Sequence, residues 1–202
     1  MYKLPIGIRV PEDNEYPSNS DIAEINRNRN AANIVSGYKL YKVKGEKYSY
    51  CAEINIDSDK IWDVFCALAR ELMGNSSYGI IGFKEDEPNL SKFTKTDKII
   101  KIFNTYKFEL TNDGFLEFGI ATYDNKSLNE VFVTSFKYFK VWTNKKEILV
   151  KTLKKFGTNK IRNLEFIDDY PVISEALDCD SASGIKNDSE VLDSILQQFK
   201  EI

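Results

Sequence analysis

The sequence predicts an α+β fold with a mainly antiparallel sheet, two principal helices and a further helix at the C-terminus. Three observations support this. Short runs of alternating apolar and polar residues, typical of strands, are separated by turn residues. Residues 57–73 and 144–156 have apolar positions at helical spacing, and a glycine follows each segment. Apolar residues make up 42% of the 202 residues, enough for a hydrophobic core, so residues 1–202 are treated as a single domain.

The first 36 residues are polar, and we expect an irregular segment over residues 1–36. Residues 2–10 alternate apolar and polar side chains, which indicates a short edge strand. Ser20 is a suitable N-cap for a short helix. Residues 26–33 are rich in asparagine and arginine and are predicted to form a solvated loop, with a small anion-binding patch at their arginines as the alternative.

Strands and helices then follow in the order expected for a layered fold. Residues 37–56 are predicted to form a hairpin, and residues 57–73 a helix with a wide apolar stripe. Residues 78–83 form a compact apolar run, typical of a buried strand, and an acidic turn follows at residues 84–88.

The middle of the chain predicts a short helix and several strands. The helix covers residues 99–103. Residues 106–110 and 115–123 are predicted to pair as a hairpin, because an Asp-Gly turn between them supplies a positive φ. Residues 130–142 form a long strand region whose alternation changes phase, which indicates a bulge or burial on both faces.

A second principal helix begins at Thr143 or Asn144 and ends at Gly157. We expect four of its apolar side chains to face the core: Ile148, Leu149, Leu153 and Phe156. The remaining elements are, in order, a strand at residues 164–167, an acidic turn at 168–171, a short strand at 172–177, a polar linker at 178–188 and an amphipathic helix at 190–200.

An internal duplication is one interpretation of this order of elements. When Gly74 is aligned with Gly157, both copies show the pattern F-x-[DE]-D-x-P nine residues later. The two halves would span about residues 38–124 and 130–177, each with a strand–helix–strand unit. The alternative is that such units recur by chance.

Several classes of catalytic and cofactor site are excluded by residue content. The chain contains no histidine, so Ser-His-Asp and Cys-His catalysis and His-containing zinc sites are excluded. Neither GxGxxG nor GxxxxGK[ST] occurs, and no cofactor is therefore expected. Carboxylate chemistry, lysine chemistry and binding without catalysis are left open.

Charge and cysteine content set further expectations about partners and location. The net charge of −3 gives no support for a nucleic-acid binder, although 28 lysines and arginines allow a local basic patch. The three cysteines include no CxxC motif, which favours unpaired thiols in a reducing compartment. No apolar run is long enough for a signal peptide or a membrane span, so we expect a cytoplasmic protein that does not bind membranes.

The candidate site residues lie in the two acidic turns. They are Glu85, Asp86 and Glu87 in the first turn, and Asp168, Asp169 and Tyr170 in the second. Three interpretations stay open: solvated turns, an acidic surface for a basic partner, or a catalytic or metal site. Five tyrosines offer a second candidate surface, either core or interface: Tyr38, Tyr41, Tyr48, Tyr50 and Tyr78. The lysines between Lys145 and Lys155 on the second helix are interpreted as a solvated face, with phosphate or nucleic-acid contact as the alternative.

Residues 130–174 resemble a type of small bacterial immunity protein from polymorphic-toxin systems. The resemblance lies in the aromatic strand EVFVTSFKYFKVWT, a helix ending in KKFG, and the segment NLEFIDDYPVIS. It implies a cytosolic, non-enzymatic inhibitor that binds a cognate toxin, often through acidic surface. The sequence therefore favours a non-catalytic protein-binding protein. The alternative is a carboxylate-based enzyme, or a small-ligand or metal binder, formed where both acidic turns converge between duplicated halves.

Overall fold

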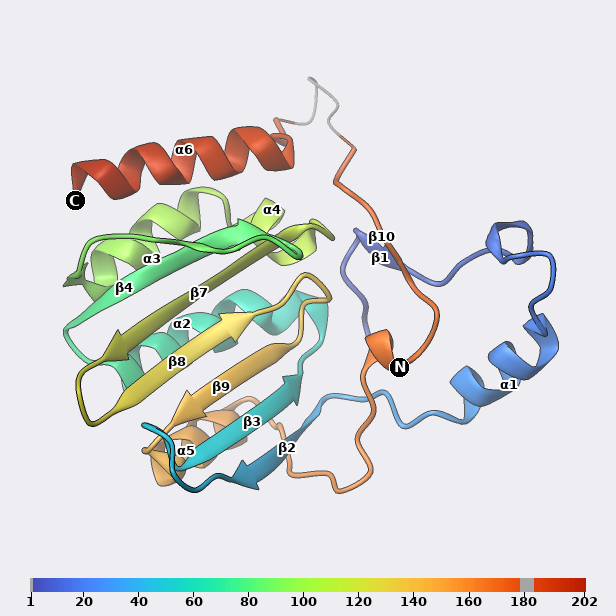
Figure 1. Cartoon of the computed structure of the whole chain (residues 1–202), viewed down its shortest axis with the longest axis horizontal. Coiled ribbons are helices and arrows are strands. Elements are labelled where there is room, and N and C mark those ends of the chain that lie inside the picture. Colours follow the sequence, from blue (N-terminus) through green and yellow to red (C-terminus); the bar gives the residue numbers. More distant parts are fainter. Residues whose placement is uncertain (1, 179–183) are drawn as a thin grey trace.

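An eight-stranded antiparallel sheet is the framework of the chain, whose computed structural model describes residues 2–178 and 184–202. The strand order is β2-β3-β9-β8-β7-β4-β5, and β6 pairs with the other end of β4 (Figure 1). The strands beyond β4, β5 and β6, have two residues each, whereas β2 at the opposite edge of the sheet has six. The bounds are β2 Gly37–Lys42, β3 Tyr50–Asn55, β4 Ser76–Phe83, β5 Asn89–Leu90, β6 Thr94–Lys95, β7 Leu116–Tyr123, β8 Leu128–Val133 and β9 Phe139–Thr143.

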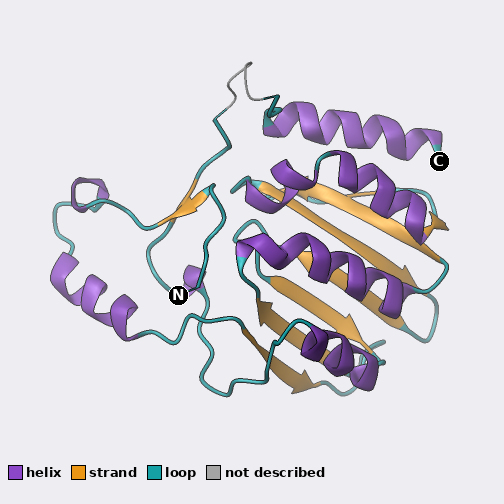
Figure 2. Cartoon of the chain, turned by 180° about the vertical axis from the view of Figure 1, so that it is seen from behind, coloured by secondary structure: helices purple, strands orange, loops and turns teal. Residues whose placement is uncertain are grey.

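Helices cover one face of this sheet and leave the other without helices. Figure 2 shows the helices in front of the sheet, whereas Figure 1 presents the helix-free face. The covering helices are α2 Ile61–Met73, α3 Thr96–Thr105, α4 Lys107–Asn112, α5 Lys146–Lys155 and α6 Asp188–Glu201. The main core lies between these two layers, with Phe65 of α2 packed edge-on against Phe118 of β7 at 4.9 Å between ring centroids. This arrangement confirms the predicted α+β class, with additional helices beside the two expected ones.

The predicted glycine stops and the terminal helix are confirmed. Gly74 and Gly157 follow α2 and α5 with φ values of 77° and 73°, and glycine adopts such positive values without steric cost. Helix α6 buries Val191, Ile195 and Phe199 at helical spacing against the main core. The helix is therefore part of the fold rather than a free appendage.

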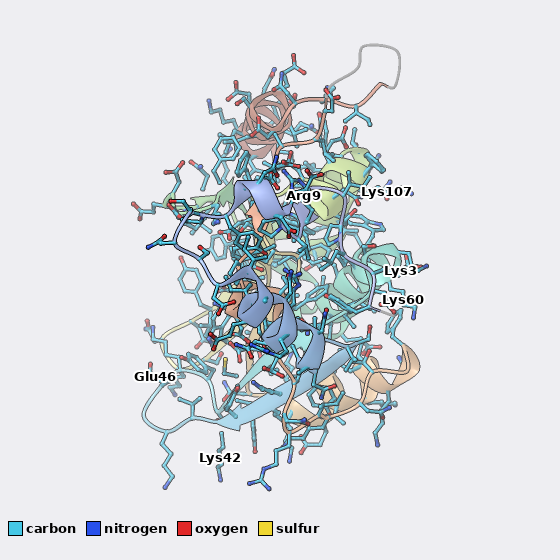
Figure 3. The ribbon with its side chains drawn as sticks, turned by 90° about the vertical axis from the view of Figure 1, so that its right-hand side faces the viewer. Lys3, Arg9, Lys42, Glu46, Lys60 and Lys107 are labelled. Carbon is cyan, nitrogen blue, oxygen red and sulfur yellow. The ribbon has the colours of Figure 1, made fainter. Side chains whose placement is uncertain are left out.

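A small second sheet fastens the N-terminal segment to the rest of the chain. Strand β1 (Ile8–Arg9) pairs antiparallel with β10 (Ile173–Ser174). Arg9, which is labelled in Figure 3, forms ion pairs with Glu15 at 2.6 Å and Glu175 at 2.7 Å. The segment also contains the short 3-10 turn η1 (Asp13–Glu15), whereas a second such turn, η2 (Ser58–Lys60), directly precedes α2. The segment is thus less irregular than its composition suggested.

The polar segment that we expected to be a loop is largely helical. Helix α1 (Ile22–Ala31) includes most of residues 26–33, and its N-cap is Asp21 rather than Ser20. The Asp21 carboxylate accepts the Glu24 N–H at 2.9 Å. None of its residues is buried, and Figure 1 shows the helix extending away from the sheet. The sequence signal for this helix is therefore the side-chain N-cap at Asp21, because the helix has no apolar stripe.

The predicted first strand at residues 106–110 is wrong, because this segment forms helix α4. Tyr106 and Leu110 are buried and Phe108 between them is 42% exposed. Burial of positions i and i+4 with position i+2 in solvent fits a helix, whereas a strand would bury all three. The second predicted strand, β7, is confirmed.

The expected long strand at residues 130–142 is two strands joined by a tight turn. Strand β8 ends at Val133, β9 begins at Phe139, and the two pair antiparallel from Glu130–Trp142 to Val133–Phe139. The change of phase in the alternation marks this turn rather than a bulge. Lys137 holds a φ of 63° there without a glycine or asparagine to signal it.

Two further boundaries differ from the prediction. Residues 164–167 form no strand; the chain is irregular and then enters the 3-10 turn η3 (Ile167–Asp169). Leu164 and Phe166 are nevertheless buried, in a satellite cluster with Tyr138. Helix α5 begins at Lys146, and its Ile148 is 36% exposed instead of facing the core.

The strand order does not support the internal duplication. Strands β8 and β9 belong to the second proposed half, yet they lie between β3 and β7 of the first half. The second unit also lacks a closing strand, because Phe166 lies outside regular structure whereas Phe83 ends β4. The matched pattern F-x-[DE]-D-x-P is therefore a local likeness between two different environments.

Candidate partner-binding surface

The helix-free side of the sheet, here called the open face, is formed by alternate residues of each strand. Successive side chains of a strand point to opposite faces, and the register places the following residues together. Because Ala52, Ile54, Val131 and Val141 pack against the helices, their sequence neighbours lie on the open face. The members of the open face are Lys39, Tyr41, Cys51, Glu53, Tyr78, Glu117, Tyr123, Glu130, Phe132, Lys140 and Trp142.

Large aromatic side chains make this face less polar than a solvated sheet. Tyr41 is 45% exposed and Tyr123 is 52% exposed. Tyr123 stacks on Tyr78 at 4.9 Å, and Tyr78 also contacts Phe93 at 5.0 Å, which together form an exposed aromatic cluster. An antiparallel sheet with one solvated face normally carries polar residues there. The aromatic content therefore indicates a surface suited to contact with another molecule.

The second acidic turn is fixed against one end of the open face. The Tyr138 hydroxyl donates to the Asp168 carboxylate at 3.2 Å, and the Tyr138 ring packs on Phe166 at 4.8 Å. The ammonium of Lys39, a residue of the open face, lies 5.4 Å from the centre of the Phe166 ring. Burial of its carboxylate raises the pKa of Asp168 above the usual value. Asp168 is thus a fixed feature of this face rather than a mobile turn residue.

Asp169 and Tyr170 are positioned by the same segment. The Asp169 carboxylate accepts the Phe166 N–H at 2.9 Å and so closes the 3-10 turn. The Tyr170 hydroxyl donates to Glu165, and this hydrogen bond is the main cause that raises the pKa of Tyr170 to about 12. Glu165 in turn accepts the Asn33 N–H at 2.8 Å, which lowers its own pKa. These contacts place the carboxylates of the second turn at the rim of the open face.

Tyr41 and Glu53 link the aromatic and acidic parts of the open face. The Tyr41 hydroxyl donates to Glu53 at 3.1 Å. Burial, followed by this hydrogen bond and a smaller contribution from Asp169, raises the pKa of Tyr41 to about 12. The contact of Lys39 with Phe166, rather than this small effect of Asp169, links the second turn to the open face.

Within the residues that the structure describes, no hydrogen bond or ion pair joins the first acidic turn to the second. Glu85, Asp86 and Glu87 follow the end of β4, and Glu85 has a φ of 71°. Over residues 2–178 and 184–202, no group of three or more acidic or cysteine side chains could hold a metal ion. The alternative of a metal site formed where both acidic turns converge therefore gains no support.

The five tyrosines do not form one stripe. Tyr38 is 4% exposed and belongs to the main core, on the helix side of β2. Tyr50 shares that side, because the Lys146 ammonium of α5 lies 5.6 Å from the centre of its ring. Tyr41 and Tyr78 lie on the open face. The prediction of one surface made of all five tyrosines is therefore wrong, because Tyr38 and Tyr50 lie on the helix side of the sheet and Tyr41 and Tyr78 on the other side.

Glu130 is a functional candidate that the sequence analysis missed. It lies on β8 between Ala121 of β7 and Trp142 of β9. Burial beside these residues raises the pKa of Glu130 to about 7. The alternation in Glu130-Val131-Phe132-Val133 could have placed it opposite the core, had residues 130–142 been recognised as two strands.

Lys137 has a strongly lowered pKa, yet its environment is structural. Its side chain is fully buried and its ammonium donates to the Leu116 carbonyl. Burial lowers the pKa of Lys137 to about 7, although Asp113 and Glu117 act to raise it. With no exposed surface the amine is closed to any substrate. It holds the β8–β9 turn against the start of β7.

Comparisons with known proteins give no assignment for the chain. No protein-family model matches it, and neither a curated protein nor a solved structure does. In the described part of the chain, no helix is long and apolar enough to cross a membrane. Cys51 and Cys66 are unpaired thiols, and Cys179 lies outside the described residues. The functional proposal therefore depends on the chemistry of the open face.

Proposed function

We propose that this chain is a non-catalytic protein-binding protein, and that it acts as an immunity-type inhibitor that neutralises a cognate bacterial toxin in the cytoplasm. The observation that supports it is the open face, where exposed aromatic rings lie beside a rim of fixed carboxylates. Tyrosine and tryptophan supply large contact area at interfaces, and their polar atoms tolerate partial exposure. No cofactor is needed for this function.

The charges of the open face favour a partner with a basic surface. Glu53 lies on β3, and Asp168 and Asp169 lie at the rim. Lys39 and Lys140 on the same face are placed over aromatic rings, those of Phe166 and Tyr138. A toxin that acts on nucleic acid must present basic residues to phosphate groups. Such a surface is complementary to carboxylates held at fixed positions.

Fixed side chains also lower the cost of association. Asp168 is bonded to Tyr138, Asp169 closes a turn, and Tyr41 is bonded to Glu53. Side chains that are already ordered lose less conformational entropy when a partner binds. The open face is therefore preorganised for binding in a way that the exposed first turn, Glu85 to Glu87, is not.

The test uses the purified product of the gene adjacent to that of this protein as the binding partner. Titration calorimetry would measure its affinity for the wild-type chain and for Tyr41→Ala, which we expect to bind at least tenfold more weakly. Phe108→Ala is the matched control, because Phe108 is a similarly exposed aromatic on α4 at the helix side. Equal weakening by both variants, or no binding by the wild-type chain at micromolar concentration, would contradict the proposal.

A further inference from the structure

One edge of strand β2 faces away from β3. Residues 159–161 of the same chain pair with the start of this edge, and the rest of the edge is unpaired. In an antiparallel pair, alternate residues direct their backbone groups toward the partner and the others point away. The Val43 N–H bonds to the Ser49 carbonyl at 2.9 Å across the β2–β3 hairpin. By this alternation Tyr38, Leu40 and Lys42 direct their N–H and C=O groups outward.

Only the first of these three residues has its outward groups occupied. Tyr38 N–H bonds to the Asn159 carbonyl at 3.0 Å, and the Ile161 N–H bonds to the Tyr38 carbonyl at 2.9 Å. Within the described ranges, the outward groups of Leu40 and Lys42 have no hydrogen-bond partner in the protein. Two backbone N–H donors and two C=O acceptors, one of each from Leu40 and Lys42, are thus available next to the part of the edge that residues 159–161 pair with.

Two surface hollows flank this edge, one on each face of the sheet. The larger has a volume of about 600 Å³, lies on the open-face side and is lined by Lys39, Leu40, Tyr41, Lys160, Ile161 and Arg162. The smaller has a volume of about 290 Å³, lies on the helix side and is lined by Leu40, Lys42, Tyr50, Lys146 and Lys160. Alternate side chains of an added strand would enter these two hollows in turn, which is the geometry of β-strand addition.

The hollows are lined by cations and by no carboxylate. Lys39, Lys160 and Arg162 line the larger hollow, whereas Lys42 and Lys146 line the smaller one beside Lys160. Figure 3 shows Lys42 at the margin of the molecule, with Glu46 near it in the hairpin turn. Glu46 lines neither hollow. An incoming strand must therefore supply negative charge to be stabilised here.

The same lysines argue against a second copy of this chain as the occupant. Pairing of two β2 edges would bring Lys42 and its neighbours of both copies together, and like charges opposite each other are destabilising. Lysine on an edge strand is a common protection against self-association. A strand with negatively charged side chains can still pair with this edge, because the lysines attract it.

We propose that the free edge of β2 binds an extended acidic segment of a partner protein as an added strand. Its backbone bonds to Leu40 and Lys42, and its acidic side chains enter the two cationic hollows alternately. This interaction depends on the backbone of the sheet edge and shares only Lys39 and Tyr41 with the open face, so it does not require that the partner be a toxin.

A short synthetic peptide of alternating glutamate and β-branched residues is the direct probe. We expect it to bind the full chain and to slow hydrogen exchange of the Leu40 and Lys42 amides. A peptide with glutamine in place of glutamate, and one with N-methylated alternate amides, should each bind at least tenfold more weakly. Equal binding of the N-methylated peptide, or binding without protection of these amides, would overturn strand addition.

Variants of the protein test the same contacts from the other side. Lys42→Pro removes an outward N–H and should weaken binding by about tenfold relative to Lys42→Ala, which removes only the cation. Lys160→Gln should weaken binding, whereas Lys151→Gln on α5, which lines neither hollow, should not. Circular dichroism and the thermal midpoint would verify folding, and the N-methylated peptide tests the backbone bonds independently should Lys42→Pro unfold.

Two results would assign the edge to a different partner. Tighter binding of an oligonucleotide than of the peptide would indicate a general basic surface, provided that Lys151→Gln weakens it as much as Lys160→Gln does. Concentration-dependent dimerisation that is lost in Lys42→Pro would indicate pairing between copies. Either result would overturn the proposal, and neither depends on whether the open face binds a toxin.

Discussion

The Tyr138 hydroxyl donates a hydrogen bond of 3.2 Å to the Asp168 carboxylate, although the two residues are 30 positions apart in sequence. Tyr138 lies directly before β9, and Asp168 lies in the 3-10 turn η3, two residues after the buried Phe166. This contact, together with the packing of Phe166 on Tyr138, positions the predicted acidic turn at the open face.

Removal of this hydroxyl should loosen the acidic turn. Tyr138→Phe removes the side-chain donor of the Asp168 carboxylate, and we expect a loss of about 1 kcal/mol in the free energy of unfolding. The pKa of Asp168 should rise further, because the bond from Tyr138 acts to lower it. Urea denaturation and carboxyl titration by NMR would measure both effects. Tyr48→Phe is the control, and an equal effect of the two variants would contradict this role.

Only part of this site follows from local sequence pattern. The residues Asp168-Asp169-Tyr170-Pro171 predict a turn from composition alone. Its position over the sheet depends on Tyr138 and Phe166, which no periodicity connects. Prediction succeeded where a signal is local, as in the apolar stripe and closing glycine of α2. It failed at Phe166, where an apolar run packs into a satellite cluster with no strand partner.

Glu130 should make stability depend on pH between its unfolded and folded pKa values. Burial raises the pKa of Glu130 from 4.5 to about 7, so the folded chain binds a proton more tightly than the unfolded chain. The associated stability is present below about pH 4.5 and is lost as pH rises through about 7. Relative to Glu130→Gln, the wild-type chain should lose on the order of 2 kcal/mol between pH 5 and pH 8.

Urea denaturation of both chains at these two pH values measures the difference directly. Glu117→Gln serves as a control on the same face, since the Glu117 carboxylate accepts the Ser135 N–H at 2.9 Å. A constant difference between wild type and Glu130→Gln across the range would show that Glu130 ionises as it does in water.

Lys137 should produce a pH dependence of the opposite sign. Burial lowers the pKa of Lys137 from 10.5 to about 7, so the unfolded chain binds the proton more tightly. Stability therefore rises with pH from about 7 toward 10. Lys137→Met keeps the length of the side chain and removes the titration. We expect wild type to gain about 1–2 kcal/mol relative to this variant between pH 7 and pH 8.5.

Exposed Lys151→Met is the control for this measurement, because a solvated lysine should leave the pH dependence of wild type unchanged. Parallel stability curves of wild type and Lys137→Met would contradict a lowered pKa. The residue also shows why the hairpin was not predicted: Lys137 adopts a φ of 63° that sequence pattern assigns to glycine or asparagine.

Helix α6 tests whether a terminal amphipathic helix is core or docking element. Phe199 is 4% exposed and lies 5.9 Å from Phe103 of α3 between ring centroids. A Cβ atom at Gly79 of β4 would lie 2.7 Å from the Phe199 ring, so helix and strand pack closely. Phe199→Ala should therefore cost about 3–5 kcal/mol, and Gly79→Ala about 1–3 kcal/mol.

The exposed face of the same helix gives the matched comparison. Glu201→Ala changes an exposed residue one turn or less from Phe199 and should alter the free energy of unfolding by less than about 0.5 kcal/mol. Denaturant midpoints for the three variants would rank them. If Phe199→Ala instead left stability unchanged, α6 would not be part of the core, and its apolar stripe would be free to bind a partner.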